Sequence, residues 1–174
     1  MAEDQVTLAL ARDRDEAITA LFVAHHARLI GLARLLVDDL PTAEDVVQDS
    51  FASLYRRWPW IRDKSASLSY LQASVANGAR SSLRRRRTAR TTTLELPGVA
   101  PSAEAAVVEA EDGQVLRKAL ARLPLRQRQV IVLRYYLDWS EKEIASTLTI
   151  SSGSVKQHTS RAMAALSKQL EAAR

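Results

Sequence analysis

Apolar residues recur at steps of three and four along the first half of the chain, which is the spacing of one face of an α-helix. Three stripes follow this spacing: Ile18, Leu21, Phe22, His25, Leu29, Ala33 and Leu36; then Val47, Phe51, Leu54 and Trp58; then Leu68, Leu71, Val75, Ala79 and Leu83. Pro41 opens the second helix, with Thr42 as its predicted N-cap and Asp45 three residues later. The first half is therefore predicted to be a helical bundle.

The last sixty residues show the same helical spacing. Two apolar stripes, Val115, Leu116, Ala119, Leu120 and Leu123, and then Val130, Leu133 and Leu137, are separated by Pro124. Ser140 and Glu143 have the spacing of a capping box, which predicts a short helix after Ser140. Ser151 is the predicted cap of a longer helix. Two helices this close, the first barely two turns long, are typical of a helix-turn-helix.

The charges divide the 174 residues into three parts. The net charge is +5, but residues 1–90 carry +3, residues 91–113 carry −5 and residues 114–174 carry +7. The acidic part contains Pro97, Gly98 and Pro101, which interrupt helices. We therefore predict an all-α protein of two small helical domains joined by a flexible acidic linker. The expected bounds are a tail at 1–14, a bundle at 15–88, the linker at 89–112 and a helix-turn-helix domain at 113–174.

Composition excludes most enzyme chemistry. The chain has no cysteine and only three histidines, His25, His26 and His158, so thiol nucleophiles and Cys-ligated metals are ruled out. No glycine-rich loop is spaced to hold phosphates. The acidic N-terminus does not resemble a signal peptide, and we expect no apolar run near the roughly 18 residues of a membrane span. These features predict a soluble, cytoplasmic, non-enzymatic protein without cofactor or metal.

The second helix of a helix-turn-helix enters the major groove of DNA, where its first residues meet base edges. Here that helix offers Ser152, Ser154, Lys156, Gln157, Ser160 and Arg161, with Gly153 allowing close approach of the backbone. Gln and Arg can bond two base-edge atoms at once, whereas Lys and Ser suit phosphates. A two-helix connection with a polar outer face is the structural alternative. The two caps in register and the +7 charge favour DNA binding.

Several short motifs of the last part occur together: LARLP at 120–124, RQR at 126–128, VIVLRYY at 130–136, SEKEIA at 140–145, GSVK at 153–156 and SRA at 160–162. They resemble the fourth conserved region of the extracytoplasmic-function (group 4) sigma factors of bacterial RNA polymerase. AEDVVQDSF at 43–51 and the stretch from Tyr70 to Arg85 resemble the second region of that family. The resemblance covers roughly residues 16–88 and 114–172. The chain departs from the family pattern at four positions. Thr149 stands where the family usually has a turn glycine, and Ser154 stands where it has Thr. Thr159 occupies a position that is commonly apolar, and Ser81 occupies one where many members have Asp.

The resemblance implies roles for four groups of residues. The residues implied to bind the polymerase clamp helices are Glu44, Asp45, Gln48 and Asp49, and those implied to touch phosphates or the polymerase flap are Arg126, Arg128 and Arg134. The residues implied to bind the minus-10 element are Trp60, Tyr70, Asn77, Arg80, Arg84, Arg85, Arg86 and Arg87. The helix-turn-helix residues would bind the minus-35 element. Trp58 continues a core stripe and is expected to be structural.

Purely structural interpretations of several of these residues stay open at this point. The acidic patch also fits an ordinary solvated helix face, and Asn77 also fits a capping or buried role. The linker fits either a solvated tether or, by the resemblance, a segment that follows the RNA path of the polymerase. His158 is expected to project near the DNA groove as a phosphate contact or bystander.

Two functions from different classes fit these observations. The first is a sigma factor, a subunit without catalysis that binds core polymerase, recognises the minus-35 and minus-10 elements and helps to melt the DNA. Its partners would be core RNA polymerase and promoter DNA, with an anti-sigma factor left open, no membrane, and a monomer when free. The alternative is a free-standing helix-turn-helix regulator. Such regulators usually dimerise, and no heptad or apolar patch is left over here for a dimer.

Overall fold

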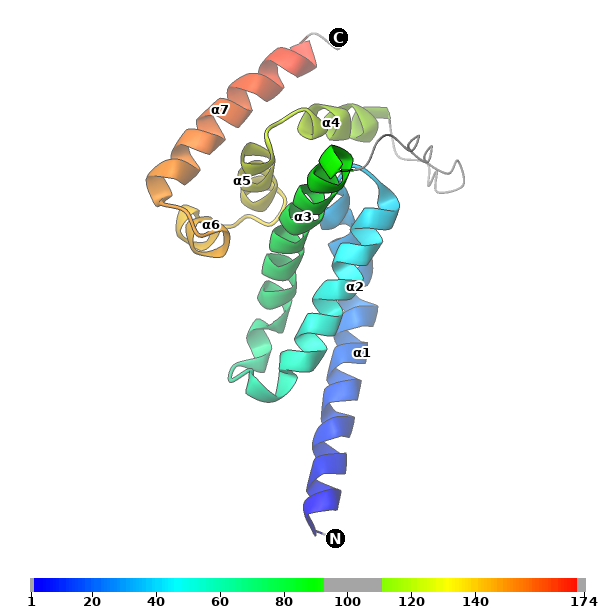
Figure 1. Cartoon of the computed structure of the whole chain (residues 1–174). Helices are drawn as coiled ribbons and strands as arrows, with labels where there is room; N and C mark the ends of the chain where they lie inside the picture. Colours follow the sequence, from blue (N-terminus) through cyan, green and yellow to red (C-terminus); the bar gives the residue numbers. More distant parts are fainter. Residues whose placement is uncertain (1, 93–110, 172–174) are drawn as a thin grey trace.

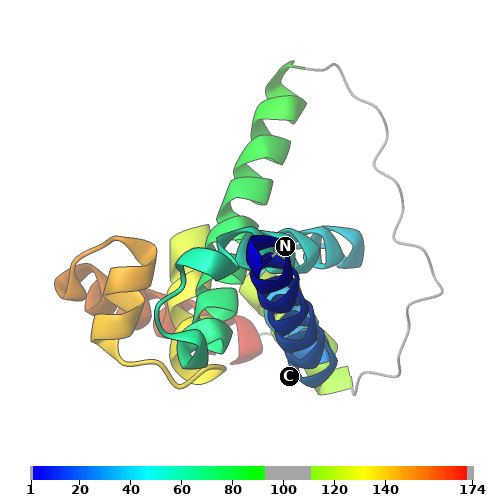
Figure 2. The same ribbon diagram turned by 90° about the horizontal axis from the view of Figure 1, so that it is seen from below.

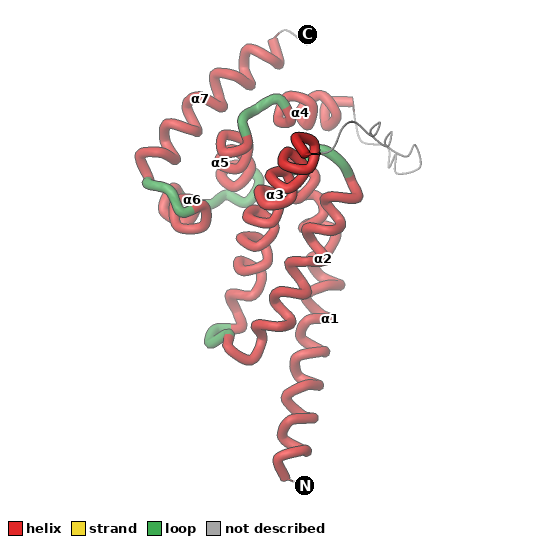
Figure 3. The backbone as a smooth tube through the Cα atoms, viewed as in Figure 1, coloured by secondary structure: helices red, strands yellow, loops and turns green. Residues whose placement is uncertain are grey.

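The computed structural model describes the backbone of residues 2–92 and 111–171 and the side chains of residues 13–85 and 113–171. The elements in chain order are α1 (Ala2–Leu36), α2 (Leu40–Arg57), two 3-10 turns (Trp58–Trp60 and Lys64–Ala66), α3 (Ser67–Thr92), α4 (Glu111–Ala121), α5 (Leu125–Tyr135), α6 (Glu141–Leu148) and α7 (Ser152–Glu171). Within these described ranges there is no strand (Figure 3), so the all-α prediction is confirmed.

Helices α1, α2 and α3 pack into a bundle, called here the N-terminal block (Figure 1). Its core consists of the residues that the apolar stripes predict: Leu29, Ala33 and Leu36 of α1, Val47, Phe51 and Leu54 of α2, and Leu71, Val75 and Ala79 of α3. Gly78 permits α2 and α3 to lie close together, because a Cβ atom at this position would be 3.2 Å from Cγ1 of Val46.

Three boundaries differ from those expected. Helix α1 begins at Ala2, so residues predicted as a tail are helical, consistent with the Ala, Leu and Arg that favour helices in this stretch. Helix α2 begins at Leu40, so its N-cap is Asp39, whose carboxylate accepts hydrogen bonds from the backbone and hydroxyl of Thr42 at 2.9 and 2.8 Å. The prediction of Thr42 as the cap is therefore wrong. Helix α3 continues to Thr92, and residues 93–110 of the predicted linker lie outside the described residues.

One segment, Asp13–Leu36 of α1, is long and apolar enough to cross a membrane by length and composition alone. The expectation that no segment approaches this length is therefore wrong. Core helices of soluble proteins have the same composition, and Leu29, Leu32, Ala33 and Leu36 of this segment are buried against the rest of the protein. This packing explains those four residues, but only 17 % of the apolar window is buried, and Phe22 and Val23 in the same segment are exposed.

Helices α4 to α7 form the C-terminal block, in which α6 and α7 are the predicted helix-turn-helix. Ser140 and Glu143 make the predicted capping box, and Ser151 accepts the backbone N–H of Ser154 at 3.1 Å. The turn between α6 and α7 passes through Thr149, whose φ of 54° lies in the left-handed region. This is where the family resemblance leads one to expect glycine, and a β-branched residue there is strained.

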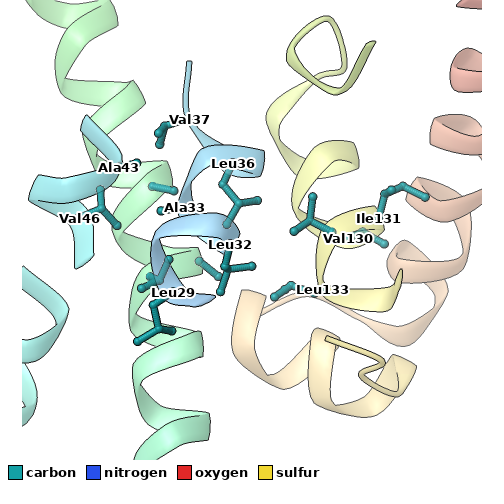
Figure 4. Packing of buried hydrophobic residues seen from close by; sticks show 14 of the residues in the cluster. Leu29, Leu32, Ala33, Leu36, Val37, Ala43, Val46, Val130, Ile131 and Leu133 are labelled. Atoms are coloured by element: carbon teal, nitrogen blue, oxygen red, sulfur yellow. The ribbon is translucent and has the colours of Figure 1, made fainter. Parts of the chain in front are cut away.

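The two blocks pack directly against each other through α1 with α4 and α5, and through α3 with α6. Figure 4 shows Leu32 and Leu36 of α1 facing Val130 and Leu133 of α5 across this contact. Figures 1 and 2 both place α6 on the opposite side of α3 from α2. The buried apolar residues of both blocks therefore form one continuous cluster.

Candidate nucleic-acid interface

The first three turns of α7 present a polar face to solvent. Val155 and Ala162 on the opposite face are buried and hold α7 against the block. Of the predicted minus-35 residues, the exposed ones are Ser152, Lys156, Gln157, Ser160 and Arg161. Ser154 is half-buried, and its hydroxyl lies 2.9 Å from the hydroxyl of Ser151, so it belongs to the helix cap. This face can therefore offer donors of several kinds to a ligand without rearrangement.

Two details qualify this face. The ammonium of Lys156 lies 3.8 Å from the carboxylate of Glu141, an exposed pair that water and salt screen strongly. His158 is half-buried and its buried Nδ1 has no hydrogen-bond partner within the described residues, so of the two expected roles the structure fits the bystander better than the phosphate contact. The helical period places His158 beside the inward residues Val155 and Ala162, which explains its burial.

The capping box fixes the start of α6 and so the angle at which α7 is presented. The Glu143 carboxylate accepts the Ser140 backbone N–H at 2.7 Å and its hydroxyl at 2.6 Å. These two bonds lower the pKa of the Glu143 carboxyl below its ordinary value of 4.5. The box therefore depends on the ionised form of Glu143.

We expect Ser140→Ala to lower the free energy of unfolding by about 1 kcal/mol at pH 7, the usual effect of losing an N-cap. Because folding lowers the pKa of Glu143, the stability it contributes is complete above 4.5 and is lost as the pH falls through the folded value. Urea unfolding at pH 7 and at pH 3 measures this. A difference between mutant and wild type that does not shrink in acid would contradict the ionised box.

The segment between α2 and α3 contains two tryptophans that differ in their exposure to solvent. Trp58 is only 5 % exposed, whereas Trp60, at the end of the same 3-10 turn, is 77 % exposed. Tyr70, the other predicted stacking residue, is half-buried, and its hydroxyl lies 3.0 Å from the Ser53 hydroxyl. Trp60 is therefore the freely accessible aromatic platform in this segment.

Helix α1 braces the end of α2 and the segment that follows it, through residues that the sequence analysis did not identify. The Tyr55 hydroxyl donates to the Asp15 carboxylate at 2.9 Å, and the Lys64 ammonium donates to Asp13 at 3.1 Å. The guanidinium of Arg14 lies 3.9 Å above the Tyr55 ring. The bond to Asp15 is the main reason why the pKa of the Tyr55 phenol is raised. The contacts join positions 40 and 51 residues apart, and no local motif marks them.

A hollow of about 570 Å³ lies between α2 and α3. Its lining includes Asn77, Arg80, Arg84 and Arg85 of the predicted minus-10 group and Asp49 of the predicted polymerase patch. The amide of Asn77 is engaged, since its Nδ2 donates to the Thr147 carbonyl of α6 at 3.3 Å. The side chains of Arg86 and Arg87 lie outside the described residues. The structure thus gathers three of the predicted arginines around one hollow.

The predicted polymerase patch forms one exposed strip on α2. Glu44, Asp45, Gln48 and Asp49 are all exposed, while Val46, Val47 and Phe51 of the same helix are buried. None of these four side chains is required by the core of the bundle. The patch therefore offers carboxylates and an amide to a basic partner surface.

The three arginines predicted to touch phosphates or the polymerase flap are less available. Arg128 is 5 % exposed and is bonded inside the protein, so that prediction is wrong for Arg128. Arg126 is half-buried, and its burial, together with nearby Arg80, lowers the pKa of its guanidinium. Arg134 donates to the Trp139 carbonyl at 3.1 Å. A helical period cannot distinguish these arginines from outward ones, because their contacts are with residues outside their own helix.

Within the described residues, no group of three or more His, Cys, Asp or Glu side chains is placed to hold a metal ion.

Comparison with known proteins matches both blocks. The family profile Sigma-70 region 2 matches residues 21–89, and Sigma-70, region 4 matches residues 113–166. The RNA polymerase sigma-E factor of Streptomyces coelicolor is 35 % identical over 144 residues, which cover 83 % of this chain and 80 % of that protein. The ECF RNA polymerase sigma factor SigM of Mycobacterium tuberculosis is 33 % identical over 154 residues, covering 88 % and 77 %.

Two solved structures have similar folds. CnrH, solved in complex with the cytosolic domain of CnrY, has a TM-score of 0.66 at 25 % identity and covers 94 % of this chain and 96 % of that one. The sigma factor RpoE of Bartonella quintana, solved with the anti-sigma factor NepR, has a TM-score of 0.70 at 24 % identity and covers 90 % and 98 %. The similarity thus spans both blocks together.

Proposed function

The chain belongs to the extracytoplasmic-function sigma factors of bacterial RNA polymerase, and from this premise we propose how its two blocks divide the work. The N-terminal block, with domain bounds 15–88, binds core polymerase and the minus-10 element. The C-terminal block, with bounds 113–174, binds the minus-35 element, and residues 89–112 connect them. Sigma factors act in the bacterial cytoplasm and initiate transcription without catalysing a reaction, and we infer the same of this chain.

The observation that carries this proposal is the exposed polar face of α7. In a helix-turn-helix the N-terminal part of the second helix meets base edges, and here that part is exposed and carries Gln157 and Arg161. Both side chains can bond two atoms of one base edge. The exposed strip on α2 and the arginines around the hollow supply the corresponding surfaces of the N-terminal block.

Replacing Arg161 with alanine is expected to weaken binding to the cognate minus-35 element by about 1–3 kcal/mol and to relax the preference for its sequence. The physical reason is the loss of a two-pronged contact to a base edge. Binding of the holoenzyme, formed with core polymerase, to promoters with matched and mismatched minus-35 elements measures both effects. Lys168→Ala, also exposed on α7 but two turns further along, is the control. Unchanged discrimination in Arg161→Ala would remove this residue from the interface.

Promoter-specific transcription tests the function as a whole. Purified core polymerase and the full chain are incubated with templates carrying candidate promoters, and run-off products are mapped. Discrete transcripts that require the chain are expected. Their absence, combined with tight binding to duplex DNA by the chain alone, would favour the free-standing helix-turn-helix regulator instead.

An anti-sigma factor is a further partner that we propose. The neighbour RpoE was solved with the anti-sigma factor NepR, and CnrH with the cytosolic domain of CnrY. Both structures are similar to this chain through both of its blocks, and this shared fold supports a partner of the same kind here.

A further inference from the structure

We propose that a short charged stretch of α1 positions the exposed ring of Trp60 for a single DNA strand, by bracing the chain on both sides of this residue. The inference deepens the proposed function of the N-terminal block and rests on it. Residues 58–66, between α2 and α3, are called here the minus-10 segment. The brace consists of Asp13, Arg14 and Asp15 on α1 and of Tyr55 and Lys64, which they contact.

The brace contacts the chain before and after the exposed ring. Before it, in the last turn of α2, the Tyr55 hydroxyl donates to the Asp15 carboxylate at 2.9 Å. After it, at the start of the second 3-10 turn, the Lys64 ammonium lies 3.1 Å from the Asp13 carboxylate. Trp60 stands between these two anchor points, five residues after the first and four before the second. A change in the direction of the minus-10 segment would therefore have to stretch or break one of the two contacts.

Two cations of the brace also pack on aromatic rings. The Arg14 guanidinium lies 3.9 Å from the centroid of the Tyr55 ring, and the Lys64 ammonium lies 5.0 Å from the centroid of the Trp58 ring. Cation–π contacts of this length are attractive. Arg14 also lies 3.5 Å from the carboxylate of Asp15, so the two side chains that contact Tyr55 contact each other. Because Trp58 is buried, Lys64 joins the brace to the core of the bundle.

Both ends of the brace are themselves fixed. On α1, Ile18 packs against the core cluster one turn after the brace, and Leu29 is buried in it. Asp13 lies 16 residues before Leu29, which is about 24 Å along a helix. Figure 1 shows α1 running beside α2 and continuing past its end. At the other end of the brace, the 3-10 turn that begins at Lys64 is capped by the carboxylate of Asp63. Helix α1 thus extends the rigid core of the bundle to the minus-10 segment.

The charges of the brace favour a role in geometry over a role in attracting DNA. Carboxylates repel phosphates, and the pairing with Asp13 neutralises Lys64, a cation in a segment proposed to bind DNA. Both effects lower the electrostatic attraction for a nucleic acid. A ring held in place in advance loses less conformational freedom when a base stacks on it, and this gain in affinity depends on position and not on charge. The brace can therefore strengthen binding at Trp60 although it contains two acids.

The α1 side of the brace lies outside the part of the chain that the region 2 profile describes. That profile matches residues 21–89, so it includes Tyr55 and Lys64 but not the stretch at 13–15. The positioning role thus comes from contacts of this chain and not from the family resemblance.

Binding of the holoenzyme to a single strand tests the brace. The probe is a labelled oligonucleotide with the non-template minus-10 strand of a promoter mapped by run-off transcription. The brace variant, Asp13→Ala with Asp15→Ala, should bind it roughly three- to tenfold more weakly, the effect of ordering one or two side chains on binding. The sign is decisive, because the loss of two negative charges would by itself tighten binding to DNA. Glu16→Ala, which removes an exposed acid outside the brace from the same helix, is the matched control and should bind at least as tightly as wild type.

Two further measurements separate positioning from other roles of the same residues. Asp13→Lys combined with Lys64→Asp restores an ion pair of reversed polarity and should recover most of the affinity that Asp13→Lys alone loses. If Lys64 bound a phosphate instead, the exchanged variant would be the weaker of the two. Hydrogen exchange of the free full chain should become faster at residues 58–66 in the brace variant and stay unchanged in α5 and α7, because only the segment opens locally. Alanine favours helices, so α1 itself is preserved.

The brace would be overturned by a brace variant that binds the strand as tightly as wild type, by unchanged exchange at residues 58–66, or by exchange that becomes faster throughout the chain. Failure of the proposed function is distinguishable from these results. It would be seen as a wild-type holoenzyme that does not bind the minus-10 strand, whatever the exchange of the free chain. A wild-type holoenzyme that binds the strand no better than the brace variant does rejects the brace alone.

Discussion

Replacing Trp60 with alanine should weaken binding of a single-stranded minus-10 oligonucleotide by about 1–3 kcal/mol, the usual value of one base stacked on an aromatic ring. Since Trp60 is 77 % exposed, the folding stability should stay within about 0.5 kcal/mol of wild type. The substitution of Trp58, two residues earlier, should affect folding stability rather than binding of the oligonucleotide. Trp58→Ala removes a buried ring from the core and should lower the free energy of unfolding by about 3–5 kcal/mol.

The two tryptophans control for each other because they share a 3-10 turn and differ only in their surroundings. Fluorescence anisotropy with a labelled oligonucleotide measures binding, and urea unfolding measures stability. Trp58→Phe keeps a large apolar ring at the buried position and should recover most of the lost stability. If Trp60→Ala destabilised the fold as much as Trp58→Ala, or bound the oligonucleotide as well as wild type, the stacking assignment would fail.

Replacing Arg84, Arg85, Arg86 and Arg87 together with glutamine should flatten the salt dependence of promoter binding. Each phosphate contact contributes about 0.9 to the slope of log affinity against log salt, so four contacts would reduce the slope by up to about 3.6. Between 50 and 200 mM salt this changes the ratio of wild-type to variant affinity by about a hundredfold. The arginines at 84 and 85 are exposed and line the hollow beside α2, which places them within reach of a backbone phosphate.

A salt titration of promoter affinity with the holoenzyme measures this slope. Lys118→Gln on α4 with Arg122→Gln in the turn directly after it, two exposed basic residues, tests whether any loss of positive charge has the same effect. We expect the slope of this control to match wild type. An unaltered slope in the fourfold variant would mean that the arginine run is only solvated.

The sequence predicts what depends on local spacing. The apolar stripes identify the buried faces of α1, α2 and α3, and the serine at 140 with the glutamate at 143 locates the start of α6. Boundaries were less predictable, because Asp39 and Thr42 both have capping side chains near the same helix start and only the backbone decides between them. Exposure of the recognition face of α7 was also predictable, since its inward residues follow one helical stripe.

Contacts between distant residues could not be predicted in this way. Arg128 and Leu36 are 92 positions apart, and the sequence around Arg128 resembles any basic helix face. The brace from Asp13 and Asp15 to the segment at 55–64 has the same character. An amphipathic stripe shows which face is buried but not which partner covers it. For that reason the packing of the two blocks, and with it the inward direction of Arg128, follows only from the structure.

The capping of α1 by Arg128 has a consequence for how this chain can be divided into fragments. A fragment that ends before α4 would leave the carbonyl of Leu36 without its guanidinium donor and the carboxylate of Asp38 without its ion-pair partner. It would also lose the cover that α5 gives to Leu32 and Leu36 of α1. The N-terminal block on its own is therefore expected to be less stable than the same block within the whole chain.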